Sequence, residues 1–345
     1  MAAVLETTTT NGSKISAFLG KVRQARLPWM PMIVMAVVII SAIFAPFLAP
    51  HDPGRDGIDL LNKKRPPIFV GDRTTSKTVV ESVELGKGNV LISLGDAQKI
   101  DSGAQLGDEV LIVERKGGTI KFPLGTDRLG RDMLSRLIYG ARTSVKISLF
   151  ALGAGAVIGT VLGLISGYKG GWVDTVIMRV TDAAMGFPTI LAAMIIVTIL
   201  GAGMWNIILA IMVTVWARFS RMIRGEVLNV RNRDFVMVAR ITGVSGPVIL
   251  WRHIFPNVVN TLLIIATLLV GQTILLEASL SFLGLGLEPG AAAWGLMVAE
   301  GRDVLIDMWW LALFPGLVIT AVVMAFNYFG DWLRDTLDPK LRRMG

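Results

Sequence analysis

Residues 147–168, ISLFALGAGAVIGTVLGLISGY, hold 22 positions without Asp, Glu, Lys, Arg or His. A helix needs about 20 apolar residues to cross the roughly 30 Å hydrocarbon core of a bilayer, so this stretch predicts a membrane-spanning helix. Glycine recurs in it every fourth residue, at Gly155, Gly159, Gly163 and Gly167. Residues four apart share one helix face, and small residues let a second helix approach closely. We therefore predict a helix-packing face; a hinge or a pore-facing stripe is the alternative.

Four more runs of the sequence lack charged residues and histidine. They cover residues 27–50, 186–217, 258–276 and 308–330. The run 186–217 would be about 48 Å long as one helix, which is too long for a single span. Gly201-Ala202-Gly203 interrupts it, so we expect two helices joined by a tight turn, with far ends near Thr181 and Ile223. The chain of 345 residues is thus predicted to be an all-α polytopic membrane protein with six transmembrane helices.

The composition supports a membrane protein and argues against several function classes. Mean hydropathy is +0.61, and 53% of the residues are hydrophobic while 17% are charged. Soluble proteins carry about 25% charged residues, so a water-soluble enzyme is disfavoured. With no cysteine and two histidines, we predict no disulfide framework, no metal site and no catalytic residues. The net charge of +8 lies beside the apolar runs, which indicates membrane topology and not nucleic-acid binding.

The distribution of Lys and Arg in short loops predicts the orientation, because these residues concentrate on the cytoplasmic side. The segment before the first apolar run carries four of them against one acid, and residues 218–257 carry seven Arg against two acids. We expect both segments in the cytoplasm. The loop 277–307 carries five acids against Arg302 alone, so we expect it outside.

These patterns divide the chain into five parts. We expect a cytoplasmic segment (1–27), a first transmembrane helix that is an uncleaved anchor (28–50), an extracytoplasmic region (51–140), a core of helices two to six (141–331) with a cytoplasmic hairpin at about 225–257, and a cytoplasmic tail (332–345). The first helix is not a cleaved signal peptide, because its apolar run is longer than the 7–15 residues typical of one.

The extracytoplasmic region contains strand-like alternation of apolar and polar residues. It covers residues 89–93, 109–114 and 119–122. Gly117-Gly118 separates the last two stretches, which is a hairpin signal. We expect a small β-rich insert at about residues 68–122, either a solvated loop or a docking surface for an outside partner. After it, Thr126 or Asp127 is expected to cap a salt-bridged amphipathic helix at the outer surface.

Residues 234–257, DFVMVARITGVSGPVILWRHIFPN, predict a helical hairpin on the cytoplasmic side. A short helix would end at Gly243, which gives the backbone freedom for a chain reversal. Ser245 is placed to cap a second helix, and Pro256 is expected to end it before the next span. The exposed face would mix charge and apolar surface, which suits docking into a groove of another protein. The alternative is a loop that only connects two spans.

This hairpin resembles the coupling motif of the integral-membrane subunits of ABC importers, in which Glu-Ala-Ala precedes Gly and then Ile-x-Leu-Pro. Ala239, Gly243 and Pro256 match in register, while Met237 replaces the Glu and His253 the Ile. The hairpin is more similar to the dipeptide and oligopeptide branch, with its Asp-Tyr-Val-x-Ala-Ala-Arg-Ala-x-Gly-Ala-Ser and Arg-His-Ile-Leu-Pro-Asn. The residues that agree are Asp234, Val236, Ala239, Arg240, Gly243, Ser245, Arg252, His253, Ile254, Pro256 and Asn257.

Three other segments look like the same branch: residues 124–139, 277–295 and 330–339. Gly125-Thr126-Asp127 with Gly130-Arg131-Asp132 resembles the C-type member of its permease pair. The insert is not explained by this resemblance.

The resemblance implies the type I ABC importer permease fold and a transport subunit that is not an enzyme. It implies these partners: a homologous second permease, two cytoplasmic ATPase subunits that bind ATP and Mg²⁺, an extracytoplasmic substrate-binding protein, and membrane lipid. No cofactor is expected in the chain itself. The residues implied in ATPase coupling are Asp234, Met237, Ala239, Arg240, Ile241, Gly243, Ser245, His253, Pro256 and Asn257.

The implied location is the inner membrane of a prokaryote, with both termini in the cytoplasm. The implied function is half of a translocation pathway for di- or oligopeptides, or for related solutes such as nickel complexes; the substrate-binding residues stay unknown. Two alternatives remain: an ion-coupled secondary transporter, which needs ionisable residues deep in its helices, and a membrane scaffold for the β-rich insert.

Overall fold

The computed structural model describes residues 27–53, 59, 62–81, 83 and 91–337. The predicted N-terminal cytoplasmic segment and most of the predicted tail lie outside these residues, as do residues 89–90 of the first strand-like stretch. Within them, five helices are long and apolar enough to cross a membrane, or six when one sharply bent helix pair counts as a span. With a small three-stranded sheet, this confirms the predicted fold class.

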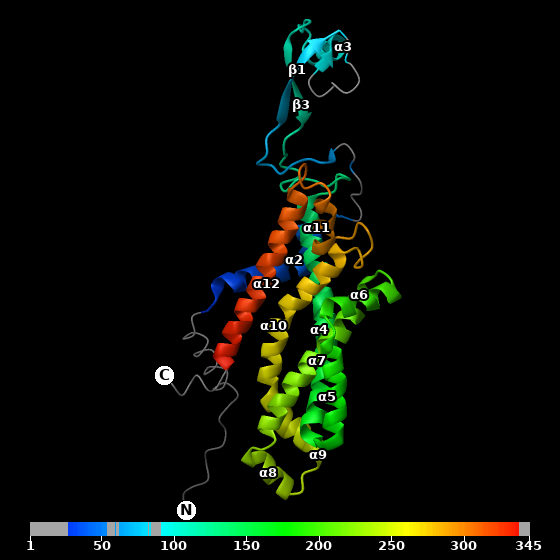
Figure 1. Cartoon of the computed structure of the whole chain (residues 1–345). Coiled ribbons are helices and arrows are strands. Elements are labelled where there is room, and N and C mark those ends of the chain that lie inside the picture. The colour runs from blue at the N-terminus through cyan, green and yellow to red at the C-terminus, as the bar shows by residue number, and fades with distance from the viewer. Residues whose placement is uncertain (1–26, 54–58, 60–61, 82, 84–90, 338–345) are drawn as a thin grey trace, which may run out of the picture.

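The spans pack into an elongated bundle (Figure 1). They are α2 (Trp29–Leu48), α4 (Met133–Lys169), α7 (Met204–Val230), a run from Gly246 that ends in α10 (Phe255–Phe282), and α12 (Trp310–Leu337). The bent pair is α5 (Gly171–Gly186) and α6 (Thr189–Leu200), which meet at 88°. Figure 1 shows the sheet at one end of the bundle and the short helix α8 (Asp234–Ile241) at the opposite end.

The bent pair corrects the expectation for the longest apolar run. The predicted break at Gly201 and Gly203 is confirmed, with φ of +87° and +148°. However, the helix before it, α6, has only 12 residues and does not reach back to Thr181. The reason is Pro188, since proline disfavours the helical conformation of the residue before it. Phe187 is accordingly extended, with φ −86° and ψ 138°, and the chain turns there.

The start of α4 corrects a second expectation. The predicted surface helix and the second span form one continuous helix of 37 residues. Its N-cap is Asp132, whose carboxylate accepts a hydrogen bond from the Ser135 N–H at 2.9 Å. Thr126 caps no helix, because its Oγ1 accepts from the Arg65 N–H at 2.9 Å. Asp127 accepts hydrogen bonds within the turn that follows it.

The insert is a small α/β unit. Its strands are β1 (Arg73–Val80), β2 (Leu91–Ser93) and β3 (Glu109–Arg115), and α3 (Leu94–Ile100) follows β2 directly. The sheet order is β2-β1-β3, with β1 parallel to β2 and antiparallel to β3. The insert has a core of its own, formed by Val79, Ala97, Ala104 and Val110.

The predicted hairpin at Gly117-Gly118 is wrong. In the described residues, β3 pairs with β1, and residues 119–122 form only an isolated bridge. The two glycines lie at the base of the insert, where the Gly118 N–H donates to the Val70 carbonyl at 2.9 Å. A Cβ on Gly118 would lie 2.1 Å from the Pro67 carbonyl oxygen. The glycine therefore permits a close backbone approach and not a turn between strands.

The four-residue glycine pattern of α4 faces α7. A Cβ on Gly159 would lie 2.3 Å from the Trp216 carbonyl oxygen, and one on Gly163 would lie 2.7 Å from the Ser220 carbonyl oxygen. Gly167 meets the Val227 side chain at 2.7 Å, whereas Gly155 has looser contacts, at 3.5 Å or more. The two helices thus approach backbone to backbone over about three turns.

Two apolar clusters hold the remaining helices. One joins α4, α6 and α7 to α8 and α10, and it includes Phe219, Val236 and Ile254. The other joins α2, α4 and α12 to α11 (Trp294–Arg302), and it includes Trp294 and Trp310. Helices α4 and α10 contribute to both clusters, so they form the axis of the bundle.

We predict that Gly159→Ala lowers the thermal stability of the detergent-purified protein, because the added methyl group overlaps the α7 backbone. Overpacking of this kind costs about 1–3 kcal/mol. Gly153 is the matched control, since it lies on the same helix with nothing within 4 Å of a Cβ. Gly153→Ala should leave the melting temperature unchanged or raise it, because alanine favours helix over glycine by up to about 1 kcal/mol. Equal melting temperatures for the two variants would contradict the packing role.

Candidate functional site

The segment after α7 folds as two short arms. The first arm, α8, ends in a Schellman motif: the Val244 N–H donates to the Ala239 carbonyl at 3.0 Å, and the Gly243 N–H donates to the Arg240 carbonyl at 3.1 Å. Gly243 has φ +78°, in the left-handed region that glycine adopts without steric cost. Gly243 thus makes the chain reversal that the sequence predicts.

Helix α8 has one buried and one exposed side. Val236 and Ala239 are buried against the bundle, at 0% and 6% exposure. On the other side Met237, Val238 and Ile241 are exposed, Ile241 at 86%. We call these three residues the docking face. A cluster of exposed apolar side chains on an anchored helix is typical of a protein-contact surface.

Arg240 lies beside the docking face and makes a contact that the sequence did not indicate. Its guanidinium carbon is 5.3 Å from the centre of the Tyr168 ring, near the end of α4. A cation over an aromatic face is attracted by the ring's negative surface. Arg240 therefore holds α8 against α4 while its side chain stays accessible.

The second arm consists of α9 (Gly246–Val248) and a π-helix, η2 (Ile249–Ile254), which continues directly into α10. Pro247 lies in the first turn of α9, as expected. Ser245 occupies the N-cap position with an extended backbone, but its side chain makes no capping hydrogen bond. Ser245 therefore has the backbone conformation of the predicted cap but not its side-chain hydrogen bond.

Pro256 does not end the second arm, contrary to expectation. It lies in the first turn of α10, directly after the π-helix and inside the helical run that continues from Gly246 to Phe282, so the proline does not break the element. Asn257 donates through Nδ2 to the His253 carbonyl at 2.7 Å, which closes the junction between η2 and α10. The arm and the fifth span are consequently one continuous element.

Three arginines of the segment expected in the cytoplasm, residues 218–257, lie inside α7, which ends at Val230 and not near Ile223. Arg221 forms an ion pair with Asp182 of α5, and Arg224 bonds both carboxylate oxygens of Asp174 at 2.6 Å. Because these partners offset the charge, α7 continues past its predicted end. Arg218, the first of the three, hydrogen-bonds only neutral groups among the described residues.

The N-terminal end of α4 carries a buried ionic network. Arg136 is 1% exposed and bonds Asp127 at 3.0 Å and Glu300 of α11 at 2.6 Å. Arg131 joins it through Asp127 at 2.5 Å. The predicted salt bridges thus exist, but they are buried between two elements and do not lie on a surface helix. They fasten α4 to α11.

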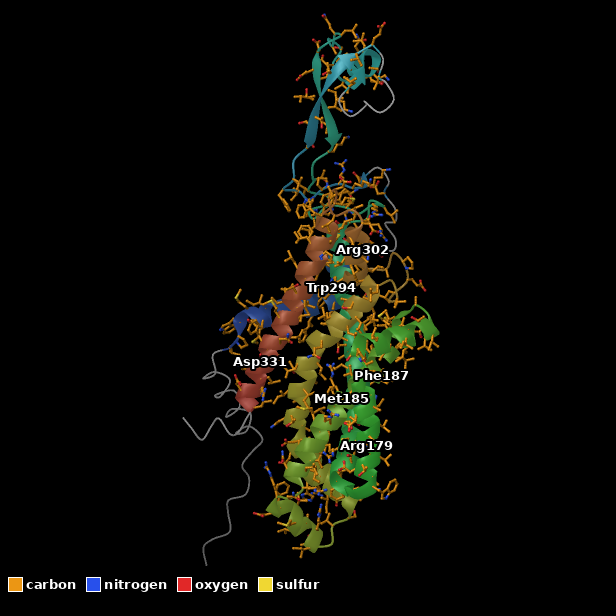
Figure 2. The ribbon with its side chains drawn as sticks, in the orientation of Figure 1. Arg179, Met185, Phe187, Trp294, Arg302 and Asp331 are labelled. Carbon is orange, nitrogen blue, oxygen red and sulfur yellow. The ribbon has the colours of Figure 1, made fainter. Side chains whose placement is uncertain are left out.

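Glu277 corrects the boundary of the predicted outer loop. It lies within α10 and is fully buried, where it accepts hydrogen bonds from Ser144 Oγ at 3.0 Å and Ser281 Oγ at 2.9 Å. Ser281 is four residues after Glu277, so the pair shares one helix face. That spacing was the sequence signal for a helical Glu277. Nearby, Trp294 of α11 (Figure 2) donates through Nε1 to the Leu137 carbonyl at 3.0 Å.

These features define a polytopic membrane protein with an exposed apolar face on a short helix at one end of its helix bundle. Among the described residues, no group of three His, Asp or Glu is arranged to hold a metal ion. The chain belongs to the family of binding-protein-dependent transport system inner membrane components, whose model matches residues 159–343.

Relatives extend the match over most of the chain. The chain is 34% identical over 311 residues to a di/tripeptide transport system permease protein of Pseudomonas aeruginosa, and the match covers 90% of this chain and 87% of that protein. A glutathione transport system permease protein of Pectobacterium atrosepticum is 42% identical over 64% of this chain and 73% of its own. A chain of the inward-facing MetNI methionine ABC transporter shares the fold, with a TM-score of 0.51 and 15% identity over 60% of this chain and 98% of its own.

The protein is therefore a multi-pass inner membrane permease subunit of an ABC importer. It is a non-catalytic component of a system that also contains an ATPase and a binding protein. Membership of this family rules against the two alternatives raised by the sequence, an ion-coupled secondary transporter and a membrane scaffold.

We predict that Gly243→Val leaves the protein in the membrane but uncouples substrate uptake from ATP hydrolysis. A side chain at this φ costs about 1–2 kcal/mol, so the Schellman motif and the position of the docking face change. Gly225→Val is the control, because Gly225 has free space and no positive φ. Uptake and ATPase activity are measured with the complex in vesicles. Normal uptake by Gly243→Val at normal protein level would contradict the role of the reversal.

Proposed function

We propose that the chain forms half of a translocation pathway for di- and oligopeptides or related small solutes. The observation that carries the proposal is the likeness to the di/tripeptide permease of Pseudomonas aeruginosa, which extends over 90% of this chain. Relatives named for glutathione and for dipeptides support it. Their names share one chemistry: a short peptide with a free carboxylate.

We propose that a homologous second permease supplies the other half. Helices α5 and α6 and the turn between them carry large apolar side chains that this chain leaves uncovered, among them Trp172, Phe187 and Ile199, which are 77%, 66% and 77% exposed. Such a surface needs either lipid or another membrane helix against it. Because this surface belongs to the bent pair α5–α6, we assign it to the second permease and assign the other exposed apolar surfaces of the bundle to lipid.

We propose that the complex contains two cytoplasmic ATPase subunits, that the docking face binds one of them, and that both termini lie in the cytoplasm. In this arrangement residues 51–140 are extracytoplasmic, residues 141–331 form the membrane core with the hairpin at about 225–257, and residues 332–345 are a cytoplasmic tail. The opposite placement of the insert and α8 along the bundle supports this orientation (Figure 1). The excess of arginine before and within the hairpin supports it further.

The orientation is tested by single-cysteine labelling, because the chain contains no cysteine of its own. Ile306 is 99% exposed, so a membrane-impermeant maleimide should label Ile306→Cys in intact spheroplasts. Asn232→Cys, between α7 and α8, should react only after permeabilisation. Labelling of residue 232 from outside would overturn the orientation and the assignment of the docking face to the cytoplasm.

The docking face is tested by charge reversal beside it. Arg240→Glu should reduce co-purification of the ATPase subunits, because an unpaired or like-charged buried contact costs about 2–5 kcal/mol. Arg233→Glu is the matched control, since Arg233 is the N-cap residue and precedes the first turn of α8. Tyr168→Leu removes the ring under Arg240 but keeps the charge, so it separates loss of the internal contact from loss of docking. Equal ATPase recovery from all variants would rule out docking through Arg240.

A further inference from the structure

Arg218 differs from the other charged residues of α7. It is the fifteenth residue of a 27-residue helix, about 21 Å from the start of α7 at 1.5 Å per residue. Its neighbours Ala217 and Phe219 are fully buried on the packed side of the helix, so Arg218 projects from the opposite side. An arginine at this depth faces a polar or water-filled space, because its charge is costly in hydrocarbon.

The partners of Arg218 are neutral. One guanidinium nitrogen donates to the Gln272 side-chain oxygen of α10, and the other donates to Thr189 Oγ1 of α6 at 3.2 Å. No carboxylate of the described residues lies within 4 Å, whereas Arg221 and Arg224 on the same helix each have an aspartate. Among the three arginines of α7, the one nearest the middle of the helix is thus the one without a carboxylate partner in the described residues.

A cavity of about 230 Å³ opens beside Arg218, at the junction of α6, α7 and α10. Polar and apolar side chains both line it, among them Thr189, Val215, Leu269, Gln272, Thr273 and Ser279. Its size suits a small group and not a whole oligopeptide. The polar groups are donors or amphoteric groups, which can satisfy an anion.

The first turn of α6 adds to the positive potential of this cavity. The N–H groups at a helix start have no intrahelical acceptor and carry a partial positive charge. The hydrogen bond between Arg218 and Thr189 fixes the guanidinium at that turn. The α5–α6 break at Pro188 therefore brings a helix start and a full cation to one point inside the membrane.

We propose that Arg218, with Thr189 and Gln272, binds the carboxylate of the solute during its passage through the membrane. The proposal rests on the proposed function, since a peptide supplies the carboxylate. Arginine pairs with a carboxylate through two parallel N–H···O bonds. A solute carboxylate would replace or supplement the contact between Arg218 and Gln272. When the carboxylate leaves, Arg218 can bond Gln272 again, so the site can release the solute as well as bind it.

The test measures binding of radiolabelled alanyl-alanine and of its C-terminal amide to the assembled complex in phosphatidylcholine nanodiscs, without the binding protein. The unmodified complex should bind the free acid at least tenfold more tightly than the amide. Arg218→Gln should remove that difference by weakening binding of the acid alone, and Arg218→Lys should retain part of it. Arg179→Gln, on the exposed side of α5 (Figure 2), should leave binding of both probes unchanged.

Several results would overturn the proposal. The first is equal binding of the acid and the amide by the unmodified complex. The second is an equal loss of both probes in Arg218→Gln. The third is that Arg218→Gln loses only co-purified phosphatidylglycerol, which would make the ligand a lipid phosphate. ATPase co-purification and cellular uptake are measured on the same preparations. If the complex assembles and transports but binds the acid and the amide equally, the proposed carboxylate site is wrong and the proposed function still holds.

Discussion

The contact between α4 and α7 determines how the other helices are placed. Because Gly159 and Gly163 bring the two backbones together, the helices pack more closely than larger side chains would allow. In a bilayer the lipid tails are as apolar as leucine, so helix association depends on van der Waals packing of this kind. The pair then offers its outer sides to α5, α6 and α10, and the cavity beside Arg218 lies where three of these helices meet.

Helix α4 also connects the two ends of the protein. At its N-terminal end, Arg136 is held by Asp127 and by Glu300 of α11. Near its C-terminal end, Tyr168 lies under Arg240 of the hairpin. One uninterrupted helix therefore contacts both α11 and the hairpin that carries the docking face. A displacement of α8 would bear directly on α4, and through the glycine contact on α7.

The sequence predicted the spans well where a run of apolar residues determines the structure, because hydropathy is a property of each segment by itself. It also located Gly243, since a chain reversal needs a residue that tolerates positive φ. The predictions from sequence were wrong where a contact with a residue distant in sequence determines the local structure. The end of α7 was placed near Ile223, too early, because the aspartates that pair with Arg221 and Arg224 lie on α5, about 40 and 50 residues away in sequence.

The same limit applies to the candidate sites. Glu277 was placed outside the membrane because a lone carboxylate marks the end of an apolar run. The spacing to Ser281 indicated a helix, but the contact with the buried Ser144 of α4 is visible only in the structure. The glycines at 117 and 118 indicated a hairpin, but a glycine needed for a close backbone approach looks the same in sequence as one needed for a turn. The cavity beside Arg218 depends on the 88° bend between α5 and α6, which no local pattern measures.

The insert is attached in a way that makes it a separable module. Its two connections lie side by side, since Arg73 pairs with Arg115 across β1 and β3 and Gly118 bonds Val70 below them. The unit has its own small core and leaves the chain at nearly the same point where it entered. Such a unit can be added, exchanged or lost at one place on the bundle without altering any membrane helix. The unit is therefore free to diversify while the helix bundle that carries it stays constant.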